Sequence, residues 1–504
     1  MANYFISIGG TGARVARSII NLCLVGAVPV NEFTILFVDA DENNKDVNNC
    51  FDAIKRYNRI REAVHIPEND FMRTEIKLYN TRFSTNADGQ QTAHILSPVR
   101  EDYDTLYKLA RSDREALDLL SVLFTKKEQE LTVDQGFHAH PAIGTIFFSD
   151  GFQFNGSEKF QDFVKYVADS VQTDNKTANV MVCGSLFGGT GASGIPSISK
   201  IMKKKFEAVV NETPLNLGGL FMLPYFSFEP KTDADPSKME ISFETFTLNS
   251  VEALNYYNSQ GCNDTLFDKI YSIGFDELTQ VGKYSEGGKT QHNKAHIAEL
   301  YAGLAAVNFF SNTAKDIKPP TYVTAREDGE LGWGSIPAVS ADVKLSKLFS
   351  KAMRTAITFM SFHEKAFKPG SAKEFRKGGL FSKRPGFDDY KMTENDETLQ
   401  NFSDMRNVLT DFVLWCSQLS DSHNINITLF NRDAVDALYQ SLAMTGGAKI
   451  EDLQKPENFG SIVEIKDETL DQFNVVNDAV LSGANAGSRS EAFKNFINNI
   501  YKQC

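Results

Sequence analysis

The 504-residue sequence lacks the features of membrane-spanning, secreted and nucleic-acid-binding proteins. No apolar run reaches the ~18 residues of a membrane-spanning helix. The N-terminal MANYFISIGG leads into a strand pattern without the charged start of a signal peptide. Lys and Arg (52) are outnumbered by Asp and Glu (65), and the net charge of −13 argues against binding to nucleic acid or anionic membranes. We therefore expect a cytoplasmic globular protein.

Cysteine is scarce, and its spacing excludes the common metal and disulfide frameworks. The six cysteines are far apart and form no C-x-x-C pair, which favours reduced thiols over disulfides or zinc ligands. His138 and His140 form an H-x-H pair, but no carboxylates accompany it at a ligand spacing, so we expect no metal site there. With 42% hydrophobic residues, the chain can form roughly two or three packed domains.

Strands and helices alternate through the first half of the chain. Residues 3–10 and 33–41 have the pattern of buried strands, and residues 12–26 between them have the apolar spacing of a helix. The alternation continues with strands at 143–150, 178–185 and 216–226 and with helices at 158–172 and 195–210. Such alternation over roughly 220 residues predicts a mainly parallel, doubly wound α/β sheet, in which ligands bind at the carboxyl ends of the strands.

Two domains are expected. Residues 1–310 form the α/β domain, with a polar, mostly helical insertion near residues 42–135, and residues 311–504 form a mostly helical domain with a few strands. Trp333 is expected to pack between them. Further elements are predicted as helices at 244–260, 293–312, 342–362 and 399–419 and as strands at 268–275 and 425–430.

Two glycine-rich loops directly follow predicted strands: GGTGAR at residues 9–14 and GGTGASG at residues 188–194. A glycine-rich turn into a helix leaves backbone N–H groups unpaired and lets an anion approach them, which makes a phosphate cradle. Either loop alone could be only a tight strand-to-helix turn. Two such loops in one α/β domain favour a ligand with several phosphates.

Spacing separates the classes of nucleotide-binding loop. Neither loop carries the Lys of G-x-x-x-x-G-K-[ST], which excludes a P-loop. The dinucleotide fingerprint G-x-G-x-x-G fits in part, because Gly10 and Gly12 match but Val15 replaces the third glycine. In that arrangement Asp39, at the end of the second strand, would hold a ribose. A Rossmann-type NAD(P)-dependent oxidoreductase therefore stays an alternative, although it leaves the second loop unused.

The second loop resembles the G-G-G-T-G-[ST]-G signature of the tubulin/FtsZ superfamily, and of its divergent bacterial tubulin-like members in particular. The order of the other elements is similar over about residues 1–310. This resemblance implies a tubulin-like nucleotide-binding domain with a long central helix, binding of GTP or GDP with Mg²⁺, and GTP hydrolysis. It also implies head-to-tail self-assembly into filaments, with the C-terminal domain offering a surface to a protein partner.

The resemblance assigns roles to particular segments. The loop His138–Gly144 is similar in place to the loop that senses the terminal phosphate, and residues 221–229 to the strand and proline loop that close on the ribose. The helix at 293–312 corresponds to the central helix, whose start stacks on and reads guanine. Asn293 and His296 could equally cap that helix. The residues expected to bind nucleotide are Gly9, Gly10, Thr11, Gly12, Ala13, Arg14, Asp39, Asp41, His140, Pro141, Ala142, Gly188, Gly189, Thr190, Gly191, Ala192, Pro224, Asn293 and His296.

The resemblance also bears on hydrolysis. Asp39 and Asp41 stand where the superfamily's second loop holds the metal and phosphate region. In FtsZ, acidic residues in the string N-x-D-x-x-D after the central helix position the attacking water at the next subunit. No such string stands in residues 311–330, directly after that helix, which leaves open a nucleotide-gated scaffold that binds without turnover. The acidic residues available for the catalytic role are Asp316, Asp328 and Glu330.

Overall fold

The computed structural model of the protein describes residues 1–66, 69–79, 84–85, 91–92, 95–100, 102–134, 136–154, 158–174, 177–210, 215–229, 243–275, 278–283, 293–311, 331–339, 344–367, 384–421, 426–445, 449–463, 472–485 and 489–504. The three acidic residues expected to act in hydrolysis, Asp316, Asp328 and Glu330, lie outside these ranges.

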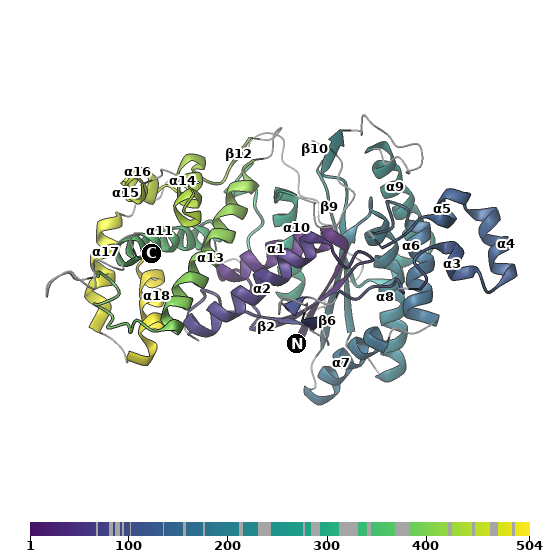
Figure 1. The fold of residues 1–504 in the computed structure, drawn as a ribbon, viewed down its shortest axis with the longest axis horizontal. Coiled ribbons are helices and arrows are strands. Elements are labelled where there is room, and N and C mark those ends of the chain that lie inside the picture. The colour runs from purple at the N-terminus through teal and green to yellow at the C-terminus, as the bar shows by residue number, and fades with distance from the viewer. Residues whose placement is uncertain are drawn as a thin grey trace.

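A six-stranded sheet forms the centre of the N-terminal half, and all of its neighbouring strands are parallel (Figure 1). Its inner strands are continuous buried apolar runs, as expected for a parallel sheet covered on both faces. In order across the sheet, the strands are β3 (Glu75–Leu78), β2 (Glu32–Val38), β1 (Ala2–Ile8), β6 (Ala178–Ser185), β7 (Leu215–Met222) and β9 (Lys269–Ile273). The predicted α/β class is confirmed, and the order is compatible with a doubly wound fold.

Helices cover both faces of the sheet, and each face has its own hydrophobic core. On one face lie α1 (Gly9–Leu24), α2 (Lys45–Val64) and α10 (Ile297–Ser311). On the other lie α6 (Pro141–Phe148), α7 (Glu158–Asp174) and α8 (Gly189–Val209), with α9 (Phe243–Ser259) beside them. Every residue of α10 except Asn308 and Ser311 is buried, so this helix has no solvent-facing side. Among the described residues, no helix combines the length and apolar character needed to cross a bilayer.

Residues 143–150 are helical, so the strand predicted there is wrong. They form α6 and the π-helical turn η1 (Ser149–Phe154) that follows it. A short apolar run does not distinguish a buried strand from a buried helix, whereas Pro141 at the first helical turn favours a helix. The helix packs tightly on α8, because a Cβ atom on Gly144 would lie 2.2 Å from Oγ of Ser193.

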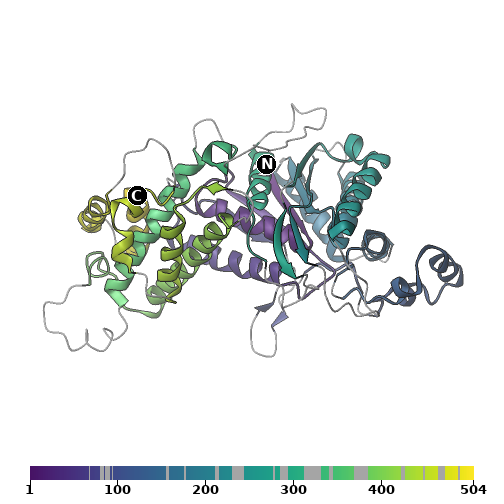
Figure 2. The same cartoon turned by 90° about the horizontal axis from the view of Figure 1, so that it is seen from above.

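The segment expected as a helical insertion, residues 42–135, contributes helix α2 and edge strand β3 to the sheet domain itself. Helices α3 (Leu106–Ala110), α4 (Arg114–Leu123) and α5 (Lys126–Glu130) form a projecting part at the end of the molecule opposite the C-terminal helices (Figure 2). The same segment also contains the short antiparallel strands β4 (Ser84–Thr85) and β5 (Gln91–Thr92), which pair with each other.

Most of the described residues of the C-terminal part are helical. Trp333, expected to pack between the domains, contacts Phe349 and Phe430 of the C-terminal part, and its indole Nε1 donates to the carbonyl of Leu429 at 2.7 Å. The helices here are α11 (Leu345–Phe367), α13 (Asp396–Leu419), α14 (Arg432–Ala443), α15 (Ile450–Leu453), α16 (Pro456–Phe459), α17 (Phe473–Ser482) and α18 (Ala492–Gln503). Two strand pairs complete the fold, β8 (Phe226–Glu229) with β10 (Thr279–Lys283) and β11 (Leu331–Gly332) with β12 (Ile427–Thr428).

One hydrophobic core is shared by the two halves of the chain. It contains Ile54 and Tyr57 of α2 together with Phe412 of α13 and Phe496 of α18. Helix α13 lies along α2 in Figure 1, and the two helices are joined by an ion pair between Arg56 and Asp411 at 2.6 Å. The C-terminal helices are therefore packed directly on the helical layer that covers one face of the sheet.

Candidate functional site

The two glycine loops lie side by side at the carboxyl edge of the sheet. Strands β1 and β6 are neighbours, with Ser7 opposite Cys183, and each runs directly into its glycine loop. A Cβ atom added to Gly9 would lie 3.6 Å from Cβ of Thr190 in the other loop. The chain leaves β1 and β6 toward opposite sides of the sheet, and ligands bind at this kind of switch point in open α/β sheets.

Packing explains why glycine is needed in both loops. A Cβ atom on Gly191 would lie 2.4 Å from the carbonyl oxygen of Ser185, and one on Gly12 would lie 3.0 Å from that of Cys183. Helices α1 and α8 can therefore start this close to the strands only without side chains. The residues that precede the two helices, Ile8 and Gly188, make no side-chain capping hydrogen bond, so these first-turn N–H groups, which suit a phosphate, are not capped in that way.

A third loop, residues 136–140, packs on the second glycine loop. Its Phe137 is so close to Gly189 that a Cβ atom there would lie 2.7 Å from Cβ of Phe137. His138 and Ala139 both have positive φ values, 44° and 60°, a conformation that costs a non-glycine residue roughly 1–2 kcal/mol. This strained loop leads into α6 at the place expected for the terminal-phosphate loop.

Asn249 of α9 connects these two loops. Its side-chain Nδ2 donates to the carbonyl oxygen of Ala139 at 2.8 Å and to that of Phe187 at 3.3 Å. One amide group thus fixes the separation between the strained loop and the residue that precedes the second glycine loop.

Two aspartates end strand β2 next to the first glycine loop. Asp39 is 2% exposed and accepts hydrogen bonds from the backbone N–H of Asp41 at 3.2 Å and from Nδ2 of Asn44 at 2.9 Å. Asn44 borders the loop, since a Cβ atom on Gly10 would lie 3.1 Å from its Nδ2. Burial raises the pKa of Asp39 to about 7, an effect that the charge of Asp41 increases and the hydrogen bonds reduce.

Asp39 and Asp41 suit a magnesium ion that shares its ligands with phosphate and water better than a metal ion whose ligands all come from the protein. Among the described residues, no group of three or more His, Cys, Asp or Glu side chains could hold a metal ion. Mg²⁺ is usually bound by one or two carboxylates together with phosphate oxygens and water. Asp39 and Asp41, beside the first glycine loop, would form a donor set of that kind if phosphate were bound there.

A buried ion pair joins Arg14 of the first glycine loop to Glu299 of helix α10. The guanidinium Nη2 of Arg14 lies 2.5 Å from Oε1 of Glu299, and the hydroxyl of Tyr225 donates to the same oxygen at 2.9 Å. Burial alone would lower the pKa of Arg14, but the Glu299 carboxylate raises it overall, so the guanidinium stays charged. Burial raises the pKa of Glu299, and Arg14 opposes that shift.

His296 caps the start of helix α10, and its side chain is buried. Its Nδ1 accepts a hydrogen bond from the N–H of Ala298 at 3.1 Å, which assigns the ring hydrogen to Nε2, 2.9 Å from Oγ1 of Thr279. Burial lowers the pKa of His296 to about 3, so the ring is neutral. Of the two interpretations of this residue, the structure shows the cap, because both ring nitrogens bond within the protein.

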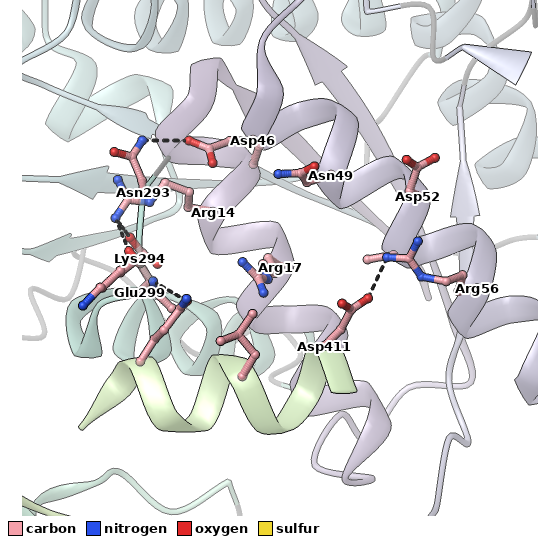
Figure 3. A pocket seen from close by; sticks show the side chains of 15 residues that line it. Arg14, Arg17, Asp46, Asn49, Asp52, Arg56, Asn293, Lys294, Glu299 and Asp411 are labelled. Carbon is pink, nitrogen blue, oxygen red and sulfur yellow. Dashed lines mark hydrogen bonds and ion pairs between the residues drawn. The ribbon is translucent and has the colours of Figure 1, made fainter. Parts of the chain in front are cut away.

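A polar cavity of about 370 Å³ lies between α1, α2, the start of α10 and α13 (Figure 3). At one end Asn293 donates to Asp46 at 3.1 Å, and at the other Arg56 pairs with Asp411. The cavity borders the first glycine loop, because a Cβ atom on Gly10 would lie 3.6 Å from Oδ2 of Asp46. Its charged lining residues are Arg14, Arg17, Arg56, Lys294, Asp46, Asp52, Glu299 and Asp411.

Four other expected residues lie beside the site. Pro224 accepts a hydrogen bond from the N–H of Phe275 at 3.2 Å and precedes Tyr225, which reaches the buried ion pair. His140 starts α6 with Pro141 and Ala142, and its Nδ1 lies 3.7 Å from Oε1 of Glu128 in the projecting part. Burial lowers the pKa of His140, so this contact orients the ring without a full ion pair at neutral pH.

Asn249 and Glu299 are among the residues of the site that were not expected from the sequence. Glu299 could have been found, because it is the one charged residue of the apolar helix Ile297–Ser311, and a charge in such a helix needs a partner. Asn249 gives no comparable signal, since polar residues are common in the helix around it.

A scan of the chain against models of known protein families finds no match, and a search of curated proteins finds no significant match. The chemistry of the site is therefore the basis for its function.

Proposed function

We propose that this chain is a tubulin-like protein that binds GTP with Mg²⁺, hydrolyses it and assembles head to tail. The observation that carries the proposal is the pair of glycine-rich, uncapped helix starts side by side at the switch point of a parallel sheet. The loop 136–140 and the polar cavity provide further walls for the terminal phosphate and for the base and ribose. Guanine, hydrolysis and assembly rest on the resemblance to the tubulin/FtsZ superfamily.

The strand order of the sheet is also that of Rossmann folds, so it is equally compatible with the dinucleotide alternative. One residue favours the first proposal. Val15 is fully buried at the position where the dinucleotide fingerprint needs a third glycine for close packing of the helix on the strand.

Hydrolysis would depend on charge stabilisation and on the position of water. Backbone N–H groups at the starts of α1 and α8 would hold the phosphates and stabilise the charge that develops on them. When bound, Mg²⁺ would neutralise further phosphate charge, with Asp39 and Asp41 as its protein ligands. A carboxylate from the segment after Phe310 would orient the attacking water at the next subunit, in a heterologous contact that forms open filaments.

Mass spectrometry of the nucleotide bound to protein purified without added ligand tests the proposal. Guanine nucleotide supports it, whereas a nicotinamide dinucleotide, or no nucleotide and no binding of added GTP, contradicts it. Electron microscopy with GTP and with a slowly hydrolysed analogue then tests assembly. Filaments that persist longer with the analogue are expected if hydrolysis occurs at the subunit interface, and binding without turnover would support the scaffold alternative.

Replacing Asn249 with aspartate is expected to weaken GTP binding about tenfold, or 1.4 kcal/mol. A carboxylate has nearly the same shape but no N–H, so it would face two carbonyl oxygens and push the loops apart. Ser250→Ala in the same helix is the matched control, because that hydroxyl bonds only to the carbonyl of Phe246 in the described contacts. Titration with a fluorescent GTP analogue measures both variants, and an equal effect in both would contradict the role of Asn249.

The magnesium-dependent part of GTP binding is expected to strengthen as the pH rises from about 6 to 8. With a pKa of about 7, Asp39 carries a proton below that pH and must lose it to bind the ion, so affinity rises with pH and levels off above it. Asp39→Asn is the control, since the ionisation of the terminal phosphate affects both proteins equally. Calorimetric titrations at several pH values measure the effect, and identical pH profiles for the two proteins would contradict it.

A further inference from the structure

Helix α13 of the C-terminal part forms one wall of the cavity. Asp411, Leu414 and Gln418, which lie on one face of this helix, all line it. Figure 3 shows Asp411 on α13 pointing toward Arg56 of α2, with which it forms an ion pair at one end of the cavity. The proposed nucleotide site is therefore built by both halves of the chain.

The short segment 293–295, just before helix α10, forms hydrogen bonds with three different helices. The side chain of Asn293 donates to Asp46 of α2 at 3.1 Å, and the carbonyl of Lys294 accepts from Arg14 of α1 at 3.0 Å. The backbone N–H of Ala295 donates to Oε1 of Gln418 in the last turn of α13 at 2.9 Å. In addition, Lys294 pairs with Asp421, just beyond α13.

The contact at Gln418 differs from a surface ion pair in its energetics. The N–H of Ala295 lies just before α10 and has no acceptor within a helix, and a backbone N–H that is shielded from water costs about 1–3 kcal/mol when its acceptor is lost. Gln418 supplies such an acceptor at the start of the helix that carries Glu299. It therefore fixes the position of the cavity wall opposite the first glycine loop.

We propose that Gln418 is a positioning residue of the nucleotide site and that α13 and the nucleotide stabilise each other's binding. This inference rests on the proposed function. A nucleotide that needs segment 293–295 in its observed position favours the state in which α13 is docked through Gln418. The two effects are thermodynamically linked. The factor by which docking of α13 raises the affinity for nucleotide equals the factor by which bound nucleotide raises the equilibrium constant for docking.

Gln418→Ala is expected to lower GTP affinity about fivefold to tenfold, because the Ala295 N–H loses its acceptor. Gln418→Glu keeps an oxygen at the same position and is expected to restore affinity to within about twofold of the original. The matched control is Asp404→Asn, which breaks the 2.9 Å ion pair with Arg59 in the same α2–α13 interface but does not line the cavity. This control is expected to leave affinity unchanged.

Fluorescence titration gives the affinities, and hydrogen exchange gives the reciprocal effect. GTP is expected to slow amide exchange in α13 and segment 293–295 of the original protein, and to slow it less in Gln418→Ala. Urea unfolding curves check that all variants are folded. If the original protein binds GTP and Gln418→Ala binds it equally well, or if Asp404→Asn is as weak as Gln418→Ala, the inference is wrong. An original protein that binds no nucleotide contradicts the proposed function itself.

Discussion

Valine in place of Gly189 is expected to lower the affinity for GTP more than tenfold, a loss of over about 1.4 kcal/mol, while the protein stays folded. A Cβ atom at this position would lie 2.7 Å from Cβ of Phe137 and 2.9 Å from its carbonyl oxygen, so one loop must move. Gly189 is the first residue of α8, and its displacement moves the N–H groups proposed to bind phosphate. Titration with a fluorescent GTP analogue measures the loss.

Gly334→Val is the matched control for this substitution. A Cβ atom at Gly334 would meet nothing within 4 Å, so valine there is expected to leave both binding and folding unchanged. Circular dichroism and urea unfolding check the fold of both variants. GTP affinity that is the same for Gly189→Val and the original protein would contradict the assignment of the second loop to phosphate.

Methionine in place of Arg14 is expected to lower the free energy of unfolding by about 3–5 kcal/mol, because the Glu299 carboxylate loses its partner in a buried site. Arg14 and Glu299 are 2.5 Å apart, and Glu299 is 1% exposed. The hydroxyl of Tyr225 donates to the same carboxylate and cannot replace a cation. Urea unfolding at neutral pH measures the change.

Two further variants separate this effect from a general cost of substitution. Lys77→Met breaks the ion pair between Lys77 and Glu32, which is 2.6 Å long but exposed, and is expected to cost about 0–1 kcal/mol. The double substitution Arg14→Met with Glu299→Met removes both buried charges and is expected to recover much of the lost stability. A loss in Arg14→Met no larger than in Lys77→Met would show that the buried pair does not stabilise the fold.

The inner strands of the sheet could be predicted because strands buried on both faces are continuous apolar runs. The strands predicted at residues 3–10, 33–41 and 178–185 correspond to β1, β2 and β6, although the first two predictions run past the strand ends, since β1 ends at Ile8 and β2 at Val38. Strand β3 was missed because its sequence EIKL is short, alternates in polarity and lies at an edge. The apolar run at 143–150 was assigned to the wrong class because its periodicity alone does not distinguish a strand from a helix.

Only the parts of the site that are formed by consecutive residues could be predicted from the sequence. A glycine loop between a strand and a helix is visible in a few consecutive residues, so the segments at 9–14 and 188–194 were identified, and the structure brings them together. Gln418 contacts a residue 123 positions away, and no local pattern records such a pairing. The role of His296 could not be predicted for another reason. A histidine at a helix start has the same sequence pattern whether it caps the helix or contacts a ligand.

The single hydrophobic core that α2 shares with α13 and α18 limits how this protein could have evolved. A domain with its own core can be gained, lost or exchanged as a unit, because its neighbour remains covered. Loss of the C-terminal helices here would instead expose the apolar side of α2, and an apolar surface of that kind leads to aggregation. The C-terminal helices are thus not an appended module, and substitutions in α13 are expected to have been accompanied by compensating substitutions in α2.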